Sequence, residues 1–503
     1  MPKPAALAAT VVLHRRAPAL EVYWVQRADV LQFLGGFHAF PGGRVNRADR
    51  AVPVAGLPAD AGEDLAAMIV GAAREVFEET GVLLARGARR VPAERRETAR
   101  RALLAEQLDF GAFLAQESLT LDGRDFVATA RWQSPPFQPG GFDTQFFLAE
   151  LPDAETAEIW PGELQGGEWI AAAHALERWK GNRALLAAPA LYTLRELAAR
   201  PDASPTEWAR VLGEPPEARG GKVPRIEVHP GLVMFPVRTP TLAPATHTNC
   251  IVIGGPEVLI VDPGSPYEDE QAALEAALDA LLEGSGARRR VHGILVTHHH
   301  ADHWGGVARL KAKYGVPVYA HAWTAPKVGA DAPMEGGETI ELLPEGERPW
   351  KLEVLSTPGH TPGHLALFER ASGTIVAGDL VSGLSTVVVD PPEGDMALYV
   401  ASIRRLAELP ATLILPGHGP PIGGPAHRLR YYLEHRELRE RKALAALVTG
   451  PLALEAIVAL AYDDTPGANP ALAARSALAH LLKLRDEGRA QTGPDGLWRQ
   501  PGG

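Results

Sequence analysis

The 503-residue sequence predicts a multidomain α/β protein. One observation is a series of short apolar, β-branched runs, each followed by a loop that contains glycine or proline. Another is a set of longer segments whose apolar residues recur at helical spacing and alternate with these runs. The third is the length itself, because a single hydrophobic core rarely serves a chain of this size.

The composition is that of an ordinary globular protein, with 46% hydrophobic and 22% charged residues. The only cysteine, Cys250, excludes an internal disulfide and lies in a strand-like run, so we expect a buried, unreactive thiol in a reducing compartment. A net charge of −11 disfavours broad binding to nucleic acid or to anionic membranes. No apolar run reaches the length of a membrane span, and we expect no secretory signal, no membrane partner and a cytoplasmic location.

The first domain is expected over residues 1–200. Val11–Leu13 and Val22–Val25 predict two strands, paired around a turn that contains Pro18. The regularly spaced leucines of Ala184–Ala199 predict a helix that closes the domain.

A further predicted helix, Asp64–Glu79, carries three carboxylates on one face before Gly81 ends it. Glu75, Glu78 and Glu79 stand at positions i, i+3 and i+4, so their side chains are neighbours and repel one another. A hard cation such as Mg²⁺ relieves that repulsion and can grip phosphate oxygens at the same time. The alternative is a solvated acidic helix face without any ligand.

The surrounding sequence favours the cation. Phe40-Pro41-Gly42-Gly43 and the run REVFEETGV, residues 74–82, resemble the Nudix box of Nudix hydrolases. The resemblance implies an α/β/α sandwich whose box helix binds Mg²⁺ (or Mn²⁺) and cleaves a phosphoanhydride. It implies metal binding by Glu75, Glu78 and Glu79, and catalytic roles for Glu75, Glu78 and Arg74, with Arg74 orienting a glutamate through an ion pair.

The box departs from the usual pattern, because an insertion separates its glycines from Arg74. Asp49 is the nearest candidate for the upstream glutamate of the pattern. Such an insertion recurs in a branch that resembles the peroxisomal coenzyme A diphosphatases, and Arg27 and Gly141–Leu148 support that branch. The altered spacing also leaves open a degenerate Nudix domain that serves only as a ligand sensor or scaffold.

Two further acidic residues, Glu163 and Glu168, are weaker candidates for an additional metal ligand or base in this domain. Residues 201–224 are rich in proline and glycine, and we expect them to form a linker. The second domain is expected over residues 225–424.

The second domain gathers possible metal ligands in loops that directly follow strand-like runs. These loops contain Asp262, the run His298-His299-His300-Ala301-Asp302-His303, His360, Asp379 and His418. Imidazole nitrogens and carboxylate oxygens are ligands that Zn²⁺ and similar ions take. Loops at one edge of a sheet are where such sites are built, so a metal site is favoured over a histidine-rich surface loop.

In this order, the motifs resemble the metallo-β-lactamase fold superfamily. The resemblance implies an αββα sandwich with a binuclear site that holds two Zn²⁺ ions, or Fe or Mn. It assigns His298, His300 and His360 to one metal, Asp302, His303 and His418 to the other, and Asp379 to both. Asp262 would lie behind the ligands and orient one of them. His299 would point away, and His364 is either a neighbour of the site or, the favoured reading, a histidine at a helix start.

The chemistry implied is hydrolysis, because two metals would activate a water molecule and polarise the bond to be cleaved. Asp302 and Asp379 would be catalytic by balancing charge and accepting a proton. Nothing in this ligand set chooses between an ester, a thioester, a lactam and a phosphodiester, and the substrate-binding residues stay unknown. The short gap between Asp379 and His418 leaves no room for the cap domain of some nucleic-acid-cutting members.

The last part, residues 425–503, turns helical. Arg428–Val448, Leu452–Tyr462 and Pro470–Glu487 predict helices, and Gln491–Trp498 predicts a hairpin with a Pro-Asp-Gly turn. Helices followed by a small β wing suggest a winged-helix module, which resembles the tail of mitochondrial β-lactamase-like endoribonucleases. A helical lid or a dimerisation element is the alternative, and the oligomeric state stays open.

Two functions follow. The first is a bifunctional hydrolase of small molecules, which cleaves a nucleoside-diphosphate-linked metabolite such as coenzyme A or acyl-coenzyme A in one domain. The other domain would hydrolyse an ester or thioester in the manner of glyoxalase II. The second function is RNA processing, with an endoribonuclease in the second domain and a Nudix domain that acts on nucleotide ends.

Overall fold

The structure is a computed structural model that describes residues 5–59, 61–137, 140–213, 224–284, 289–345, 348–465, 467 and 469–502. The chain forms two compact units, Met1–Pro230 and Gly231–Gly503. The domain limits drawn from the sequence at 200, 225 and 424 stay predictions. Among the described helices, none combines the length and the apolar character needed to cross a membrane.

The first unit is built on a mixed sheet in which β1 runs parallel to β8 and antiparallel to β2. Its strands are β1 (Ala6–Arg16), β2 (Leu20–Arg27), β3 (His38–Ala39), β4 (Gly42–Arg44), β7 (Val127–Gln133), β8 (Phe142–Glu150) and β9 (Leu164–Ile170). The predicted pairing of the first two strands is confirmed, with His14 opposite Val22. A smaller parallel pair joins β5 (Val54–Ala55) to β6 (Leu121–Asp122).

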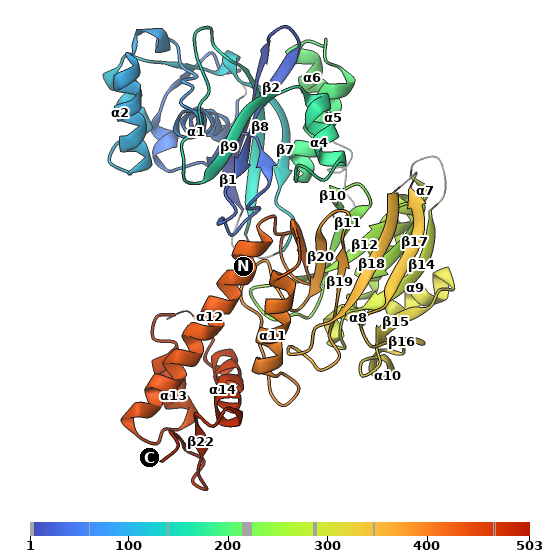
Figure 1. Ribbon diagram of the computed structural model, residues 1–503. Coiled ribbons are helices and arrows are strands. Elements are labelled where there is room, and N and C mark those ends of the chain that lie inside the picture. Colours follow the sequence, from blue (N-terminus) through green and yellow to red (C-terminus); the bar gives the residue numbers. More distant parts are fainter. Residues whose placement is uncertain are drawn as a thin grey trace. The chain divides into compact units, whose positions relative to one another are not determined.

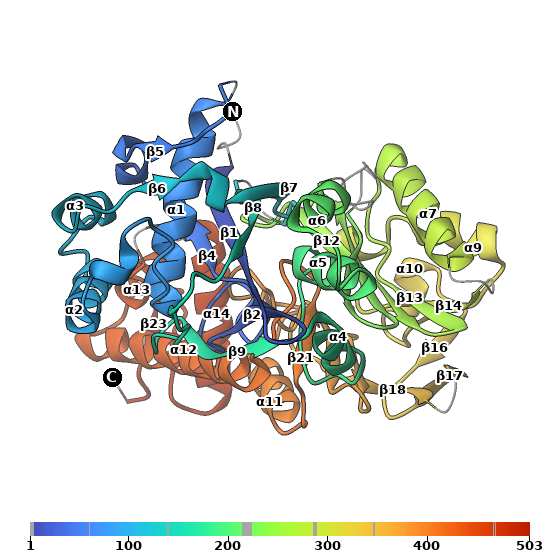
Figure 2. The same cartoon turned by 90° about the horizontal axis from the view of Figure 1, so that it is seen from above.

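Helices cover both faces of this sheet, which confirms the α/β/α sandwich (Figures 1 and 2). One face carries α1 (Glu63–Thr80), α2 (Ala93–Leu104) and α3 (Phe110–Gln116), and the other carries α4 (Ala172–Lys180), α5 (Ala188–Ala199) and α6 (Pro205–Leu212). Side chains of β1 alternate between the two cores, with Val11 on the α1 side and Val12 on the α5 side. Short 3₁₀ turns occupy Ala48–Ala51, Ala88–Arg90 and Gly123–Asp125.

Both helices predicted in this unit are present, and one of them begins later than expected. The helix that carries the carboxylates is confirmed as α1, and Gly81 ends it in the left-handed conformation with φ of 73°. The closing helix begins at Ala188 and not at Ala184, because Pro189 favours the first turn and Leu186 instead bridges to β3.

The predicted linker at residues 201–224 contains helix α6, so the expectation of a simple connection is wrong in its first half. Ser204 caps the helix by accepting a hydrogen bond from the Glu207 backbone amide, and Pro205 stands in the first turn, where proline is favourable. Trp208 is buried and donates to the Arg200 carbonyl. Residues 214–223 lie outside the described part of the chain, and β10 (Ile226–His229) ends the unit.

The second unit contains two sheets with helices outside them, which is the expected αββα sandwich (Figure 1). One sheet runs in the order β11 (Leu232–Arg238), β12 (His247–Gly254), β13 (Glu257–Val261), β14 (Arg290–Val296), β15 (Val318–His321) and β16 (Ala332–Met334). The other runs β17 (Thr339–Glu345), β18 (Arg348–Ser356), β19 (Leu365–Glu369), β20 (Thr374–Gly378) and β21 (Leu413–Pro416). The helices are α7 (Glu268–Glu283), α8 (Ala301–Trp304), α9 (Val307–Tyr314), α10 (Ala325–Val328) and α11 (Met396–Ala407).

Parallel strand pairs bring distant segments of the second unit to the same edge. In the first sheet β13 is parallel to β14, so the chain leaves both strands at one end, just before Asp262 and His298. In the second sheet β20 is parallel to β21, which places Asp379 and His418 at neighbouring strand ends. The loop that joins β18 to β19 adds His360.

The C-terminal part of this unit consists of α12 (Pro425–Ala446), a 3₁₀ turn (Leu447–Thr449), α13 (Leu454–Ala461), α14 (Pro470–Asp486), β22 (Gln491–Thr492) and β23 (Trp498–Arg499). The predicted helices and hairpin are confirmed, and Thr492 pairs with Trp498 across the Pro-Asp-Gly turn. Ile457, Leu481 and Trp498 are buried in a small core of their own.

Candidate active sites

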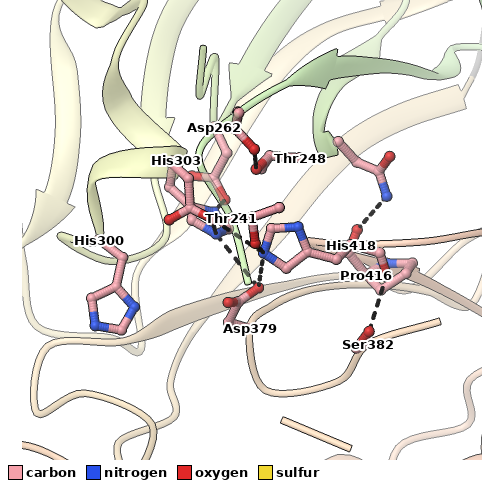
Figure 3. A network of polar contacts seen from close by, with 12 residues as sticks. Thr241, Thr248, Asp262, His300, His303, Asp379, Ser382, Pro416 and His418 are labelled. Carbon is pink, nitrogen blue, oxygen red and sulfur yellow. Dashed lines mark hydrogen bonds and ion pairs between the residues drawn. The ribbon is translucent and has the colours of Figure 1, made fainter. Parts of the chain in front are cut away.

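Five loops of the second unit converge on a cluster of imidazole and carboxylate groups (Figure 3). In the first half of this cluster, the Nε2 atoms of His298 and His360 each lie 3.0 Å from Nδ1 of His300. The Oδ2 atom of Asp379 lies 3.7 Å from Nε2 of His360. The structure therefore brings together the three histidines and the aspartate that the sequence assigned to one metal.

The second half contains Asp302, His303 and His418. Asp379 lies beside His303 and His418 (Figure 3). Nε2 of His418 lies 3.5 Å from Oδ2 of Asp302 and 3.3 Å from Oδ1 of Asp379. Nε2 of His303 lies 3.5 Å from the same Asp379 oxygen. Asp379 thus faces both halves, which is the position expected of a bridging ligand.

The outward nitrogens of these rings are fixed by hydrogen bonds. Nδ1 of His303 donates to Oδ2 of Asp262 at 2.9 Å. Nδ1 of His360 and Nδ1 of His418 donate to the carbonyls of Val388 and His247, each at 2.9 Å. A ring held in this way turns its Nε2 lone pair toward the centre, as a metal ligand requires.

Asp262 also acts on a second ring. Its Oδ2 accepts from the hydroxyl of Thr297 at 2.7 Å, and that hydroxyl lies 3.0 Å from Nδ1 of His298. Its Oδ1 accepts from the Thr297 amide at 2.8 Å. Asp262 therefore lies behind the cluster, as predicted, and orients His303 directly and His298 through Thr297.

Burial and neighbouring charges shift the pKa values of the cluster in opposite directions. Burial disfavours the imidazolium, but Asp379, Asp302 and Asp262 together raise the pKa of His303 well above its usual value. Burial likewise disfavours the carboxylate of Asp379, yet His418 and His303 hold the pKa of Asp379 well below its usual value. The cluster therefore favours an ionised Asp379 beside protonated imidazoles. A metal cation would take the place of the imidazole protons and supply the positive charge instead.

Two glycines allow this close packing. A Cβ at Gly417 would lie 2.4 Å from Oδ1 of Asp379. A Cβ at Gly378, whose φ is 49°, would lie 2.7 Å from Nε2 of His364. Both positions therefore need a residue without a side chain.

His364 belongs to this site, and its favoured assignment to a helix start is wrong. It lies directly before strand β19 and is fully buried. Its Nε2 accepts from the Asp379 amide at 3.1 Å, and its Nδ1 lies 2.8 Å from the Thr357 hydroxyl. The Thr-Pro-Gly-His run did not indicate this role, because proline and glycine before an apolar run are compatible with a helix start and with a strand start.

Two other residues border the cluster. Thr241 was not singled out from the sequence, and its hydroxyl lies 3.4 Å from Nε2 of His418 (Figure 3). Nε2 of His299 lies 3.0 Å from Oε2 of Glu393, so this nitrogen pairs with a carboxylate that belongs to neither half of the cluster. Glu393 also lies 3.2 Å from Nζ of Lys327.

In the first unit, Arg74 pairs with two carboxylates of α1 and with Asp49. Its Nη1 donates to Glu75 at 2.8 Å and to Glu78 at 3.0 Å. Its Nε and Nη2 both reach the buried Asp49 at 3.1 Å. Arg74 therefore pairs with a glutamate, as the resemblance implied, and Asp49 pairs with Arg74 although the insertion separates them in sequence.

The carboxylates lie against the glycine loop. Oε2 of Glu79 accepts from the Gly42 amide at 3.1 Å, and a Cβ at Gly43 would lie 2.5 Å from the Glu75 carboxyl carbon. Burial raises the pKa of Glu75 to about 7, although Arg74 opposes the shift. Burial, followed by the charge of Glu75, raises the pKa of Glu79 well above its usual value. A divalent cation bound by these carboxylates would offset the cost of burying their charge.

The structure separates the two weaker acidic candidates. Glu163 lies close enough for its charge to raise the pKa values of Glu78 and Glu79, after the larger effect of burial. Glu168 instead accepts from the Trp24 indole at 3.3 Å and pairs with Arg178 of α4, on the opposite face of the sheet from α1. Glu168 is therefore not part of the carboxylate cluster.

Comparison with known proteins is consistent with this geometry. A family model described as the metallo-beta-lactamase superfamily matches residues 243–418. A second, described as the beta-lactamase associated winged helix domain, matches residues 453–498 and confirms the predicted winged-helix tail.

Two curated relatives are similar to part of this chain. A hydroxyacylglutathione hydrolase of Dechloromonas aromatica is 39% identical over 165 residues, which cover 33% of this chain and 54% of that protein. A beta-lactamase-like protein 2 homolog of Drosophila melanogaster is 30% identical over 256 residues, which cover 48% of this chain and 83% of that protein. The chain belongs to the metallo-β-lactamase superfamily, and these relatives support a metal-dependent hydrolase. The match spans only about half the length of the Dechloromonas relative.

The solved structures that are similar to this chain include a Nudix protein. A NUDIX hydrolase from Alicyclobacillus acidocaldarius is 28% identical, with 40% of this chain and 94% of that protein covered at a TM-score of 0.36.

Proposed function

We propose that the protein is a cytoplasmic bifunctional hydrolase with a separate site in each unit. The second unit would hydrolyse an ester or thioester at a binuclear metal site. The first would cleave the diphosphate of a nucleotide-linked metabolite at a Nudix-type site. The observation that carries the proposal is the convergence of Nε2 of His303, Nε2 of His418 and both oxygens of Asp379 on one centre.

The donors of the second unit fit a pair of metal ions. Nε2 of His303 and Oδ1 of Asp379 are buried, and neither makes a hydrogen bond within the described residues. Such buried, unsatisfied atoms are costly unless a ligand completes them. We propose His298, His300 and His360 as ligands of one ion, Asp302, His303 and His418 as ligands of the other, and Asp379 as a ligand of both. Three imidazoles with a carboxylate suit Zn²⁺, and the same set also accepts Fe or Mn.

When bound, such ions supply Lewis acidity and lower the pKa of water toward neutrality. The chain's own groups do the rest. Asp302 and Asp379 are placed to hold the proton released by the attacking water. Asp262, the Val388 carbonyl and the His247 carbonyl keep the rings from turning during the reaction. The Thr241 hydroxyl is close enough to His418 to contact a substrate bound there.

The first unit fits a divalent cation and a diphosphate. Glu75, Glu78 and Glu79 lie on one face of α1, and burial raises the pKa of each carboxyl. A bound cation would offset the cost of burying their negative charge. Arg27 lies near this cluster, since its charge acts to lower the pKa of Glu79. A cation and a nearby arginine together are suited to the charge of a phosphoanhydride.

A Mg²⁺ ion bound by these carboxylates would supply positive charge to the leaving phosphate and orient the attacking water. Arg74 holds Glu75 and Glu78 in place through their carboxylates, and Asp49 holds Arg74 from behind. The Gly42 amide fixes Glu79. We propose coenzyme A or acyl-coenzyme A as the substrate, because one acyl-coenzyme A molecule contains both a diphosphate and a thioester.

The test of the first site is Mg²⁺-dependent release of 3′,5′-ADP from coenzyme A by the wild type and by Glu75→Gln. The proposal predicts turnover in the wild type and a loss of about 100-fold or more in the variant, with thioester hydrolysis unchanged. Turnover of any nucleoside diphosphate also eliminates the alternative of a degenerate domain that only senses a ligand. Loss of both activities in the variant contradicts two independent sites.

RNA processing is a second candidate, favoured by the winged-helix match at residues 453–498. Much of the positive charge in this tail is engaged within the chain. Arg439 and Lys442 pair with Asp464, and Lys483 pairs with Glu440. Arg430 and Arg441 are exposed, and Arg441 lies 3.8 Å from Glu437. RNA binding by the tail predicts that Arg430→Glu with Arg441→Glu lowers both the affinity and its salt dependence. Unchanged binding of single-stranded RNA removes this candidate.

A further inference from the structure

The last turn of α1 is held by groups that lie outside the carboxylate motif. A helix end leaves its final carbonyls without partners in the helix, and here each is satisfied. The Phe77 carbonyl accepts from Gly81, and the Thr80 carbonyl accepts from the amide of Glu158 at 2.8 Å. The two carbonyls between them belong to Glu78 and Glu79, the residues whose side chains are proposed to bind the cation.

Arg100 of α2 donates to both of these carbonyls, and the Glu79 carbonyl also accepts from the amide of Trp160 at 2.9 Å. Nε of Arg100 donates to the Glu78 carbonyl at 2.9 Å, and its Nη2 donates to the Glu79 carbonyl at 2.7 Å. The same Nη2 donates to the Glu158 carbonyl at 3.0 Å. The guanidinium also lies over the Trp160 ring, 5.1 Å from its centre, and Arg100 is only 6% exposed. One side chain therefore ties α1, α2 and residues 158–160 together.

The position and charge of Arg100 both matter for the carboxylates. The carbonyl end of a helix carries partial negative charge, which adds to the repulsion among Glu75, Glu78 and Glu79. A cation at this end reduces that charge. The hydrogen bonds of Arg100 also hold the backbone of the last turn, from which the Glu79 side chain accepts from the Gly42 amide.

We infer that Arg100 is a positioning residue of the divalent-cation site in the first unit, an inference that rests on the diphosphatase proposed above. It acts through the backbone of Glu78 and Glu79 and does not touch the substrate. A flexible or displaced last turn would separate the carboxylates, so the cation would bind more weakly. The expected weakening is about 10-fold, which is the lower end of the effect of groups that support metal ligands.

A neighbouring arginine provides the matched control. Arg101 lies on the same helix and also near Trp160, 6.0 Å from its centre, but its side chain is 67% exposed and pairs with Glu97 one turn away. Arg101→Met therefore removes the same kind of side chain from the same helix without reaching α1.

The surroundings of Arg100 also permit chemical rescue. A cavity of about 480 Å³ opens beside it, lined by Phe77, Thr80, Gly81, Arg96 and Glu158 together with Arg100 itself. In Arg100→Ala, a free guanidinium ion can enter this cavity and occupy the vacated position. Rescue of this kind distinguishes the loss of a positioning group from general damage to the fold.

The experiment measures Mn²⁺ binding to the full chain by electron paramagnetic resonance. The part of the signal that disappears in Glu78→Gln is assigned to this site. We expect Arg100→Met to weaken that component about 10-fold and Arg101→Met to leave it unchanged. Catalysis should follow the same pattern, with a higher Mg²⁺ requirement for Arg100→Met and a similar kcat at saturating Mg²⁺. Guanidinium, at concentrations too low to unfold the protein, should restore binding to Arg100→Ala.

Unchanged Mn²⁺ binding in Arg100→Met overturns the inference, and so does a failure of guanidinium to restore a folded Arg100→Ala. If these variants do not fold, Arg100→Lys keeps the charge but reaches fewer carbonyls, and it should weaken binding severalfold; wild-type affinity in that variant overturns the inference. A wild type that lacks the Glu78-dependent component overturns the proposed diphosphatase site and the inference with it.

Discussion

Asp262 accepts a hydrogen bond from Nδ1 of His303 at 2.9 Å, and the opposite nitrogen of the same ring lies 3.5 Å from Asp379. The imidazole is thereby fixed between a carboxylate behind it and a carboxylate in front of it. The Thr297 hydroxyl extends the control of Asp262 to His298. One buried carboxylate thus orients a proposed ligand of each metal.

Replacing this carboxylate should weaken both metals. Asp262→Asn keeps the size of the side chain but removes its charge and replaces one acceptor oxygen with an NH2 donor. His303, or Thr297 and through it His298, is then held less firmly. We expect metal affinity to fall by about 10-fold to 100-fold. Metal content after dialysis against a weak chelator measures the effect, and Asp269→Asn, on the exposed face of α7, serves as control. Full retention of metal by Asp262→Asn would contradict this role.

Gly417 should not tolerate even a methyl group. Its Cβ would lie 2.4 Å from the Asp379 oxygen that faces His303 and His418, so Gly417→Ala must displace that carboxylate. A misplacement of this size can cost about 100-fold in rate. Gly467→Ala is the control, because its Cβ would meet nothing within 4 Å. Thioester hydrolysis by Gly417→Ala at the wild-type rate would be incompatible with the proposed bridging position of Asp379.

Removal of metal should destabilise the second unit. The cluster contains buried groups that lack hydrogen bonds within the described residues, and ions bound to the folded state stabilise it by mass action. At free Zn²⁺ of 1,000 times Kd the expected gain is about 4 kcal/mol in the free energy of unfolding. Urea denaturation with Zn²⁺ and with a chelator measures it. An equal shift in His300→Ala would place the stabilising ion elsewhere.

Acid should weaken the first unit through a buried histidine of β1. Burial, helped by Arg16, lowers the pKa of His14 from 6.5 to about 4. The unfolded chain therefore binds a proton that the folded chain excludes, so stability is lost as the pH falls from 6.5 toward 4. Between pH 6.5 and pH 5 the loss amounts to about 2 kcal/mol.

His14→Phe should remove this part of the pH dependence while keeping the contact of the ring with Trp208. Hydrogen exchange of the β1 amides at pH 7 and pH 5 reports the free energy of unfolding of this unit. The change between the two pH values is then compared between the wild type and the variant. The same pH dependence in both proteins would show that His14 is not the group responsible.

The sequence allowed the proposed metal ligands to be placed together because each follows an apolar strand, and parallel strands end at a common edge. His298, His360, Asp379 and His418 therefore came together from strand order alone. It predicted α1 for a similar reason, since the apolar spacing and Gly81 are local signals.

The residues that the sequence did not place depend on contacts that have no local signal. Thr241 reaches His418 across 177 positions, and Arg100 reaches the carbonyl of Glu78 across 22. Helix α6 was taken for a linker because its prolines counted as breakers, although Pro205 stands where a helix accepts proline. His364 was uncertain because its neighbours suit a strand start and a helix start equally.

The most direct test of the two-site account follows both products of one substrate. Purified protein of known metal content is given acyl-coenzyme A and Mg²⁺, and thiol release and 3′,5′-ADP release are measured separately. The account predicts that His300→Ala abolishes only thiol release and that Glu78→Gln abolishes only 3′,5′-ADP release. If neither product forms, while the wild type cuts single-stranded RNA and His300→Ala does not, the account is contradicted and RNA processing takes its place.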